Sequence, residues 1–125
     1  SSSLADAVAA GNMNRSMELF RELINDPENT PVYLLYVLTG SMNDLYRARL
    51  ALDYNHGLPE IMKDFGYSPS VEFRVKNALS SVRRTDIRHL RKCLEILAKA
   101  DIDMKSSGAD PAVILETAIV EMLAR

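Results

Sequence analysis

Residues 85–125 read TDIRHLRKCLEILAKADIDMKSSGADPAVILETAIVEMLAR, and this stretch decides the fold. Apolar side chains recur in its first half at alternating spacings of three and four residues, the period of one face of an α-helix. That stripe consists of Ile87, Leu90, Leu94, Leu97, Asp101 and Met104, with Asp101 as its only polar member. The stretch therefore predicts two long helices joined by one loop.

Capping residues mark the ends of both predicted helices. Thr85 is expected to cap the first helix, with the carboxylate of Asp86 in the first turn, where the helix dipole favours a negative charge. Gly108 is expected to end that helix in a left-handed conformation, which glycine adopts without steric cost. Asp110 and Pro111 then predict the start of the second helix, because proline lacks an N–H that would have no partner there.

The last helix, predicted over residues 111–124, is apolar over more of its circumference than a surface helix needs. Its expected buried face consists of Ala112, Leu115, Ala118, Ile119, Met122 and Leu123. Val113 and Val120 fall instead within the opposite, polar arc of the helix. Apolar residues in that position are either covered by their own domain or offered to a partner, and the sequence leaves both alternatives open.

The order of these features resembles the C-terminal segment of the delta subunit family of bacterial DNA polymerase III. The similarity lies in an acid on a leucine stripe, Lys105 at the helix end, the loop GADP at residues 108–111 and a closing apolar helix. It reaches back to about Leu4 and corresponds to the last third of a delta subunit. This family is part of the clamp loader, which opens the sliding clamp and sets it on primed DNA in DNA replication.

The resemblance implies a collar domain, which holds clamp-loader subunits together. Its partners would be the equivalent domains of other subunits, of the gamma/tau and delta-prime types, whereas the sliding clamp would be contacted by regions outside this chain. DNA would be contacted only indirectly or weakly. We choose the exposed side of the last helix as the interface, with a basic corner as a second edge. The predicted interface residues are Val113, Thr117, Val120, Glu121, Arg83, Arg84 and Arg88.

The length and composition fit one cytoplasmic domain. A chain of 125 residues can bury a core without disulfide bonds. Its single cysteine, Cys93, adjoins the leucine stripe and is interpreted as a small buried hydrophobe in a reducing compartment. No signal peptide and no apolar run of about 18 residues occurs, so we expect no membrane association. We interpret residues 1–3 as a remnant of cloning or of a domain cut, and residues 4–125 as a single helical oligomerisation domain, a fragment of a longer chain.

The remaining sequence predicts five further helices. Turn residues and apolar periodicity place them at about residues 3–10, from 13 to the loop at 26–29, 32–54, 58–65 and 69–82. No alternation typical of a strand appears in the sequence. The predicted fold class is therefore all-α, a compact bundle of about seven helices of the clamp-loader collar type.

Two residues of the predicted third helix depart from the simple pattern. Arg49 lies on its apolar stripe, as Asp101 does on another helix, so the two could pair across the core. The alternative is that each reaches the surface or bonds locally, as Asp101 could with Lys105 four residues later. Gly40 lies in the helix interior, where it suggests a close helix crossing or a bend.

Basic residues gather between Glu72 and Lys92, where seven arginines and lysines face two acidic residues, although the whole chain has a net charge of −2. Such a corner suits a complementary partner, but a solvated surface is an equal alternative. Residues 58–79 also imitate a helix-turn-helix motif with Gly66 in the turn. Glu72 and Met62 depart from that pattern, so a small DNA-binding domain is the alternative function to an assembly module.

Catalysis is poorly supported by the sequence. It contains no glycine-rich phosphate loop followed by lysine. The two histidines, His56 and His89, have no spacing that could ligate a metal. Asp101 and Asp103 are two residues apart on a helix and point to different sides. We therefore expect no catalytic, metal-binding or cofactor-binding residues in this chain.

Overall fold

The computed structural model describes residues 2–124, and over that range every regular element is a helix. The elements are α1 (Ser2–Ala9), α2 (Met13–Ile24), α3 (Pro31–Asp53), α4 (Leu58–Asp64), the 3-10 turn η1 (Pro69–Val71), α5 (Glu72–Ser81), α6 (Ile87–Ser106) and α7 (Pro111–Leu123). This confirms the predicted all-α class and the number of helices. The interpretation of residues 1–3 falls partly on Ser1, which lies outside the described residues, as does Arg125.

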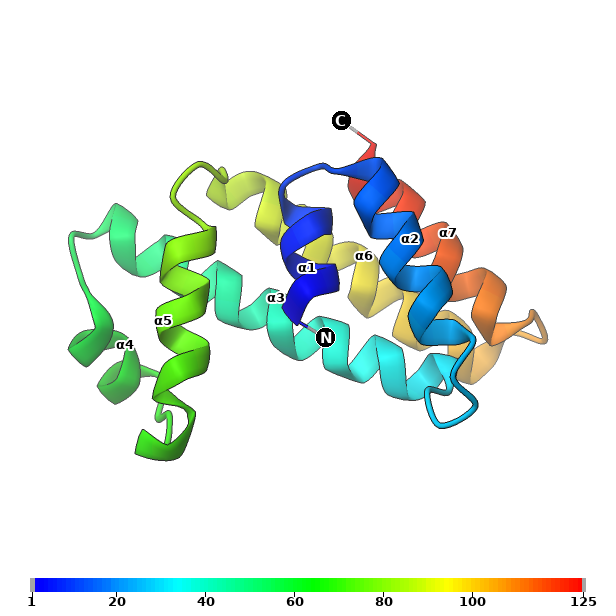
Figure 1. Cartoon of the computed structure of the whole chain (residues 1–125), viewed down its shortest axis with the longest axis horizontal. Helices are drawn as coiled ribbons and strands as arrows, with labels where there is room; N and C mark the ends of the chain where they lie inside the picture. The colour runs from blue at the N-terminus through cyan, green and yellow to red at the C-terminus, as the bar shows by residue number, and fades with distance from the viewer. Residues whose placement is uncertain (1, 125) are drawn as a thin grey trace.

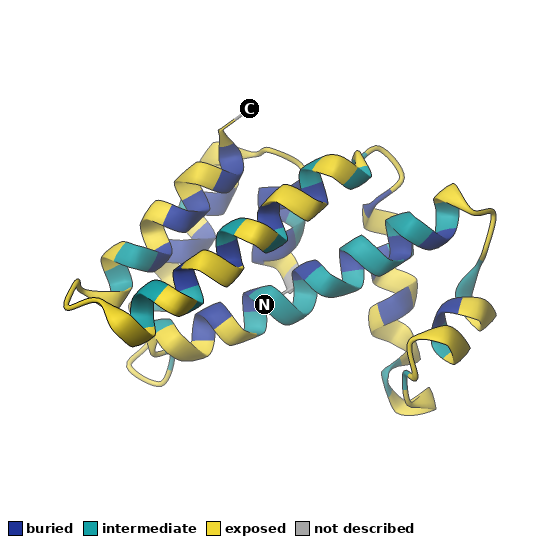
Figure 2. Ribbon diagram, turned by 180° about the vertical axis from the view of Figure 1, so that it is seen from behind, coloured by how far each residue is buried: buried dark blue, intermediate teal, exposed yellow. Residues whose placement is uncertain are grey.

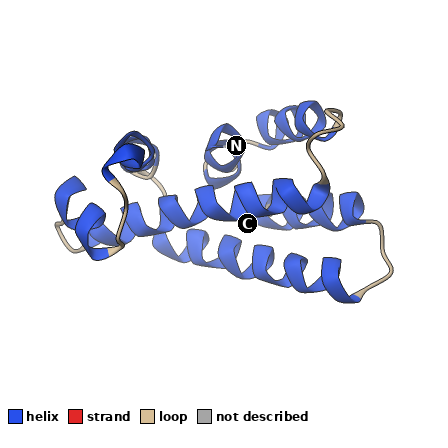
Figure 3. Cartoon of the chain, turned by 90° about the horizontal axis from the view of Figure 1, so that it is seen from below, coloured by secondary structure: helices blue, strands red, loops and turns tan. Residues whose placement is uncertain are grey.

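The long helix α3 is the axis on which the other helices pack (Figure 1). α6 packs along α3, and α7 turns back against α6. α1 and α2 form a hairpin that contacts both α3 and α7, whereas α4 and α5 pack at the far end of α3. Seen from below, the N-terminal helices lie on one side of the long helices (Figure 3). α6 and α7 therefore each bury one face in the core of the bundle and leave another face at its outer surface.

Apolar burial is divided unequally between two cores. The larger core joins all the α-helices except α4, and its most enclosed side chains include Leu4, Leu38, Met42, Leu90, Leu97, Leu115, Ile119 and Met122. Cys93 is buried in it, as predicted. The second core, between α4, α5 and the end of α3, has only Ala51, Ile61 and Val75 as buried members. Figure 2 shows the buried segments on the facing sides of the helices and the exposed segments outside.

Three helices end in the same left-handed motif. Gly11, Asn55 and Gly66 have φ angles of 75°, 59° and 67°. In each case the following N–H donates to the carbonyl five residues earlier, from Asn12 to Ala7 at 2.9 Å, from His56 to Ala51 at 2.8 Å and from Tyr67 to Met62 at 3.0 Å. This hydrogen bond is typical of the Schellman motif, which satisfies a free carbonyl at the helix end. The motif sets the direction in which α2 and α4 begin or end.

Two predicted boundaries of α6 are wrong. Asp86 caps this helix instead of Thr85, because the Asp86 backbone is extended and its carboxylate accepts a hydrogen bond from the Arg88 N–H at 2.7 Å. Gly108 is not left-handed. The chain leaves α6 through Ser107 in an extended conformation, with a φ of −100°, so the exit requires no positive φ angle.

Arg49 and Asp101 do not pair across the core, and the alternative in which each bonds locally is confirmed. Arg49 donates to the carboxylate of Asp53, one turn later, at 2.8 Å, and to two backbone carbonyls of the loop between α5 and α6 at 3.0 and 3.2 Å. Asp101 accepts a hydrogen bond from Lys105 at 3.0 Å. Each charge is thus satisfied at the rim of the bundle, where water lowers the cost of keeping it ionised.

Candidate functional site

The helix α7 is held in place by four other helices, since α1, α2, α3 and α6 all contact it. Its first turn is fixed by Asp110, whose carboxylate accepts a hydrogen bond from the Ala112 N–H at 2.9 Å, and by Pro111 in the first helical position. The buried face consists of Leu115, Ala118, Ile119, Met122 and Leu123, as predicted, whereas Ala112, also predicted on this face, is only half-buried. The opposite face of a firmly supported helix therefore remains toward solvent.

Val113 and Val120 lie on that outer face, with 58% and 43% of their surfaces exposed. The alternative in which their own domain covers them is wrong for the described chain. Thr117 and Glu121 are exposed as well. The four residues recur at helical spacing and form one strip along α7, which we call the outer α7 strip. It combines two apolar side chains with a polar edge.

A shallow groove of about 140 Å³ continues this strip toward α6. Its lining includes Ile96, Lys99 and Asp103 from α6 opposite Val113 and Thr117 from α7. Lys99 and Asp103 pair with each other at 3.5 Å, so the charges at this edge balance locally. The groove therefore has a mostly apolar floor, a balanced charge pair on its α6 side and the carboxylate of Glu121 on its α7 side.

Sequence reasoning missed Ile102, which is 62% exposed on α6. The signal was present, because an isoleucine between Asp101 and Asp103 interrupts an otherwise polar helix face. Lone exposed apolar residues are common on protein surfaces, so this residue carried little weight by itself. Together with the outer α7 strip it adds to the apolar area of this end of the molecule.

The structure does not bring the predicted basic corner together with the outer α7 strip. Arg83 and Arg84 are exposed in the loop before α6, whereas the Val113 end of the strip lies beside the other end of that helix, about 30 Å away by helical rise. The Glu121 end lies opposite Ile96, near the middle of α6, so it is closer to the corner. The guanidinium of Arg88 pairs with the Asp86 carboxylate at 2.9 Å. Hydrogen bonds from Arg88 lower the pKa of Asp86 to about 2, so the charge of Arg88 is balanced locally.

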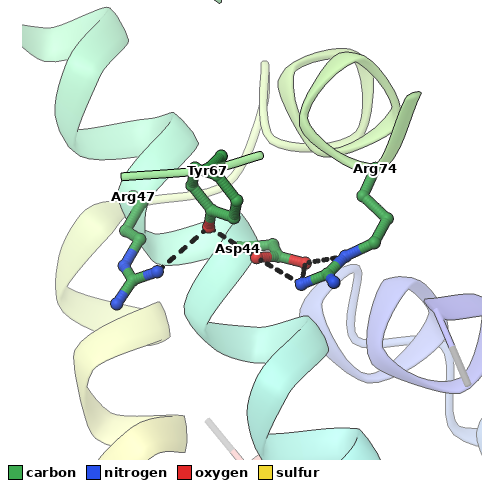
Figure 4. A network of polar contacts seen from close by, with 4 residues as sticks. All are labelled: Asp44, Arg47, Tyr67 and Arg74. Atoms are coloured by element: carbon green, nitrogen blue, oxygen red, sulfur yellow. Dashed lines mark hydrogen bonds and ion pairs between the residues drawn. The ribbon is translucent and has the colours of Figure 1, made fainter. Parts of the chain in front are cut away.

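A network of polar contacts fastens the α4 and α5 pair to α3 (Figure 4). Asp44, whose side chain is 11% exposed, accepts hydrogen bonds from the Tyr67 hydroxyl at 2.6 Å and from Arg74 at 2.9 Å. Arg47 donates to the Tyr67 oxygen at 3.2 Å and lies 5.0 Å from the ring centre of Phe65. Burial and the bond to Asp44 raise the pKa of the Tyr67 hydroxyl. The guanidinium of Arg74 is therefore engaged within the protein.

Neither a metal-ligand cluster nor a membrane-spanning helix is found among the described residues. Across residues 2–124, no three His, Cys, Asp or Glu side chains gather where they could hold a metal ion. None of the helices in this range is both long and apolar enough to cross a bilayer.

The comparison with protein families decides where the chain belongs. A family model described as the DNA polymerase III delta subunit, C-terminal domain, matches residues 3–122. The chain belongs to this family. The predicted membership is thereby confirmed, and the match begins close to Leu4, where the resemblance was expected to start.

Two delta proteins illustrate this membership. The DNA polymerase III subunit delta of Bacillus subtilis (strain 168) is 24% identical over 110 residues, which are 88% of this chain and 30% of that protein. The solved structure of the Bacillus subtilis DNA clamp loader delta protein superposes with a TM-score of 0.84 at 21% identity, over 98% of this chain and 35% of that one. The fold is therefore that of the delta C-terminal domain, and the chain spans about a third of the length of these relatives.

Proposed function

We propose that this delta-type domain joins clamp-loader subunits in a collar and takes no catalytic part. Residues 4–125 would act as one oligomerisation domain of a longer chain in the bacterial cytoplasm. Its neighbours would be subunits of the gamma/tau and delta-prime types, and the collar would support sliding-clamp loading in DNA replication. Membership in the delta family supports this role. Regions outside this chain would contact the clamp.

The outer α7 strip is the observation that carries the proposal. Val113 and Val120 are exposed on a helix that four neighbours hold in place, so covering the strip orders little of the backbone. Burial of apolar surface releases about 25 cal/mol for each Å² removed from water. Thr117 and Glu121 provide the polar rim that surrounds the apolar centre of many interfaces. The strip thus has the composition and the rigidity of a helix-packing surface.

The basic corner would form a second edge of the same assembly. Arg83 and Arg84 are exposed, and no ion pair of either is found among residues 2–124. Exposed charges of this kind mainly guide orientation and raise the association rate. Arg88 would contribute less, because Asp86 already balances its charge. An acidic surface on the neighbouring subunit would be the matching partner.

The test is to mix the chain with partner subunits and follow assembly by sedimentation velocity. Val113→Glu should weaken assembly about tenfold or more, because a carboxylate cannot be buried cheaply at an apolar contact. Val32→Glu is the matched control, since Val32 is also a valine in the first turn of a helix and is also 58% exposed. Equal assembly by both variants would contradict the choice of face.

A helix-turn-helix DNA-binding domain is the second candidate. α4 and α5 do form a helix pair, with left-handed Gly66 at the end of α4. However, Arg74 is held by Asp44, and Lys76 pairs with Glu72 at 3.5 Å, which leaves α5 few free cations for phosphates. We expect no measurable binding to duplex DNA at moderate salt. Tight binding that weakens steeply between two salt concentrations would favour this alternative.

A further inference from the structure

A second groove, of about 610 Å³, lies between α1, α3 and α5. On α3 its lining extends from Tyr36 to Leu45, a distance of about 13 Å along the helix. Asp6 of α1 lines one wall, and Phe73 and Asn77 of α5 line the other. In Figure 1, α1 and α5 both lie in front of α3. It shares no residue with the outer α7 strip.

The floor of this groove is built from small side chains. Thr39, Gly40 and Ser41 follow one another on α3 and all line it. A Cβ atom added at Gly40 would meet no atom within 4 Å. The close helix crossing predicted at Gly40 is therefore not made by any described helix of this chain. A floor of small residues allows an incoming helix to approach at the short end of the usual 8–10 Å range between axes.

Two aromatic rings on the groove lining are unusually exposed. Tyr36 on α3 is 77% exposed and Phe73 on α5 is 62% exposed. Tyrosine and phenylalanine are enriched at the centres of interfaces, where a partner side chain covers them. The two rings thus offer an apolar contact area on the α3 and α5 sides of the groove.

One acidic side chain in the groove lining, Asp6, has no ion-pair partner within the described chain. Burial raises the pKa of the Asp6 carboxyl, and a hydrogen bond from Ser81 offsets only part of this effect. Asp44, the other acid in the lining, is already paired with Arg74. The groove therefore holds one partly desolvated carboxylate whose natural complement is a lysine or arginine.

From these features we infer that the groove binds a basic amphipathic helix of a partner protein. One lysine or arginine of that helix would pair with Asp6, and apolar side chains three or four residues away would lie against Tyr36 and Phe73. A helix fits better than an extended strand, because helical walls offer no free backbone edge for strand pairing. This inference concerns a different surface from the outer α7 strip and goes beyond the collar assembly proposed above.

The test is an NMR titration of the isotope-labelled chain with a designed helical peptide. The probe has about 14 residues, near the shortest length at which an isolated helix is stable, with leucines and lysines on one face. A second peptide carries glutamate in place of lysine. The basic peptide should shift the amide signals of residues 39–44 and of Asn77 in a saturable way, and the acidic peptide should not. Failure of both peptides to bind, or shifts confined to α7, would overturn the inference.

Two variants separate the contributions of charge and shape. Asp6→Asn keeps the side-chain size and should weaken binding of the basic peptide about tenfold, because it removes the charge partner. Gly40→Leu should abolish binding, since its side chain fills the open floor while the helix persists. A dispersed spectrum confirms that each variant folds. Wild-type affinity in both variants would overturn the inference.

Val113→Glu is the control that separates this groove from the proposed collar contact, because it should leave peptide binding unchanged. Loss of peptide binding in this variant would overturn the assignment to the groove. Concentration-dependent dimerisation of the chain that Gly40→Leu abolishes would assign the groove to a second copy, which would also overturn the inference. Failure of collar assembly alone would not affect it.

Discussion

Two helix pairs, α6 with α7 and α4 with α5, pack on the same helix α3 but are held by different forces. α6 and α7 bury leucines, isoleucine and methionine in the larger core and still leave Val113 and Val120 exposed. α4 packs only in the core with three buried residues, and α5 adds little more than Ala78 to the larger core, so this pair depends in addition on the contacts of Asp44 with Tyr67 and Arg74. The α6 and α7 pair thus leaves apolar surface exposed after filling its core, whereas the α4 and α5 pair is held by a polar network in addition to its small core.

The two kinds of packing predict different stabilities for the two helix pairs. Apolar burial is non-directional and stabilises in proportion to the buried area. The larger core can therefore hold α6 and α7 firmly while two valines on the outside of α7 stay exposed. A polar network is directional, and the loss of one member leaves the others unsatisfied in a partly buried place. We therefore expect the α6 and α7 pair to supply a stable docking face, and the α4 and α5 pair to open locally first.

Truncations of core side chains should separate the two helix pairs by the largest difference in stability. Leu97→Ala removes an enclosed side chain of the larger core and should cost about 2–5 kcal/mol of global stability. Ile61→Ala removes a side chain of similar size from the smaller core and should mainly expose α4 and α5. Urea denaturation and amide hydrogen exchange measure the two effects. Equal loss of protection across all helices in both variants would show that the two cores unfold as one.

Loss of the network charge should have the next largest effect. Asp44→Asn leaves Arg74 without its carboxylate and should cost about 1–3 kcal/mol, because the bonds to Asp44 lie in a partly buried site. Asp101→Asn is the control, since Asp101 forms an exposed pair with Lys105 and should change stability by less than about 1 kcal/mol. Hydrogen exchange should show faster opening of α4 only in the first variant. An equal effect of both substitutions would remove the special role of the network.

Gly40→Ala should stabilise the protein by about 1 kcal/mol. Gly40 lies inside α3, where glycine is a poor helix former, and an added Cβ meets open space. Thermal denaturation of the variant and the wild type measures the change. A lower midpoint for the variant would mean that something outside the described chain occupies the groove floor in solution.

The smallest effect concerns the coupling of Arg49 with Asp101. The two residues bond to separate partners, so the stability losses of Arg49→Gln and Asp101→Asn should add within about 0.5 kcal/mol. Denaturation of both single variants and the double variant closes this cycle. A larger coupling energy would show that Arg49 and Asp101 interact in solution, which would contradict the separate partners seen in the structure.

The sequence predicts features that depend on near neighbours along the chain. The cap formed by Asp110 is observed as expected, and Asn12 and Thr30 cap α2 and α3 in the same way, because each capping bond joins residues two or three positions apart. The outward positions of Val113 and Val120 follow equally from the phase of a single helix. These local rules, with the family resemblance, were enough to choose the candidate strip.

Contacts between distant residues could not be predicted in this way. Asp44 meets Tyr67 and Arg74, 23 and 30 residues later, and no periodicity marks such a set. Met13 is 48% exposed although it is a large apolar residue, because α2 buries Ser16, Leu19 and Phe20 instead. The rotation of a helix about its axis is set by its neighbours, which a single sequence does not specify.

Cross-saturation NMR on the assembled complex measures directly whether partner subunits contact the outer α7 strip. The chain is labelled at its valine methyl groups, partner subunits of the gamma/tau and delta-prime types are irradiated, and the loss of each methyl signal is measured. We predict strong attenuation at Val113 and Val120 and none at Val32, whose exposure equals that of Val113. Attenuation at Val32 with none at Val113 and Val120 would contradict assembly through the outer α7 strip.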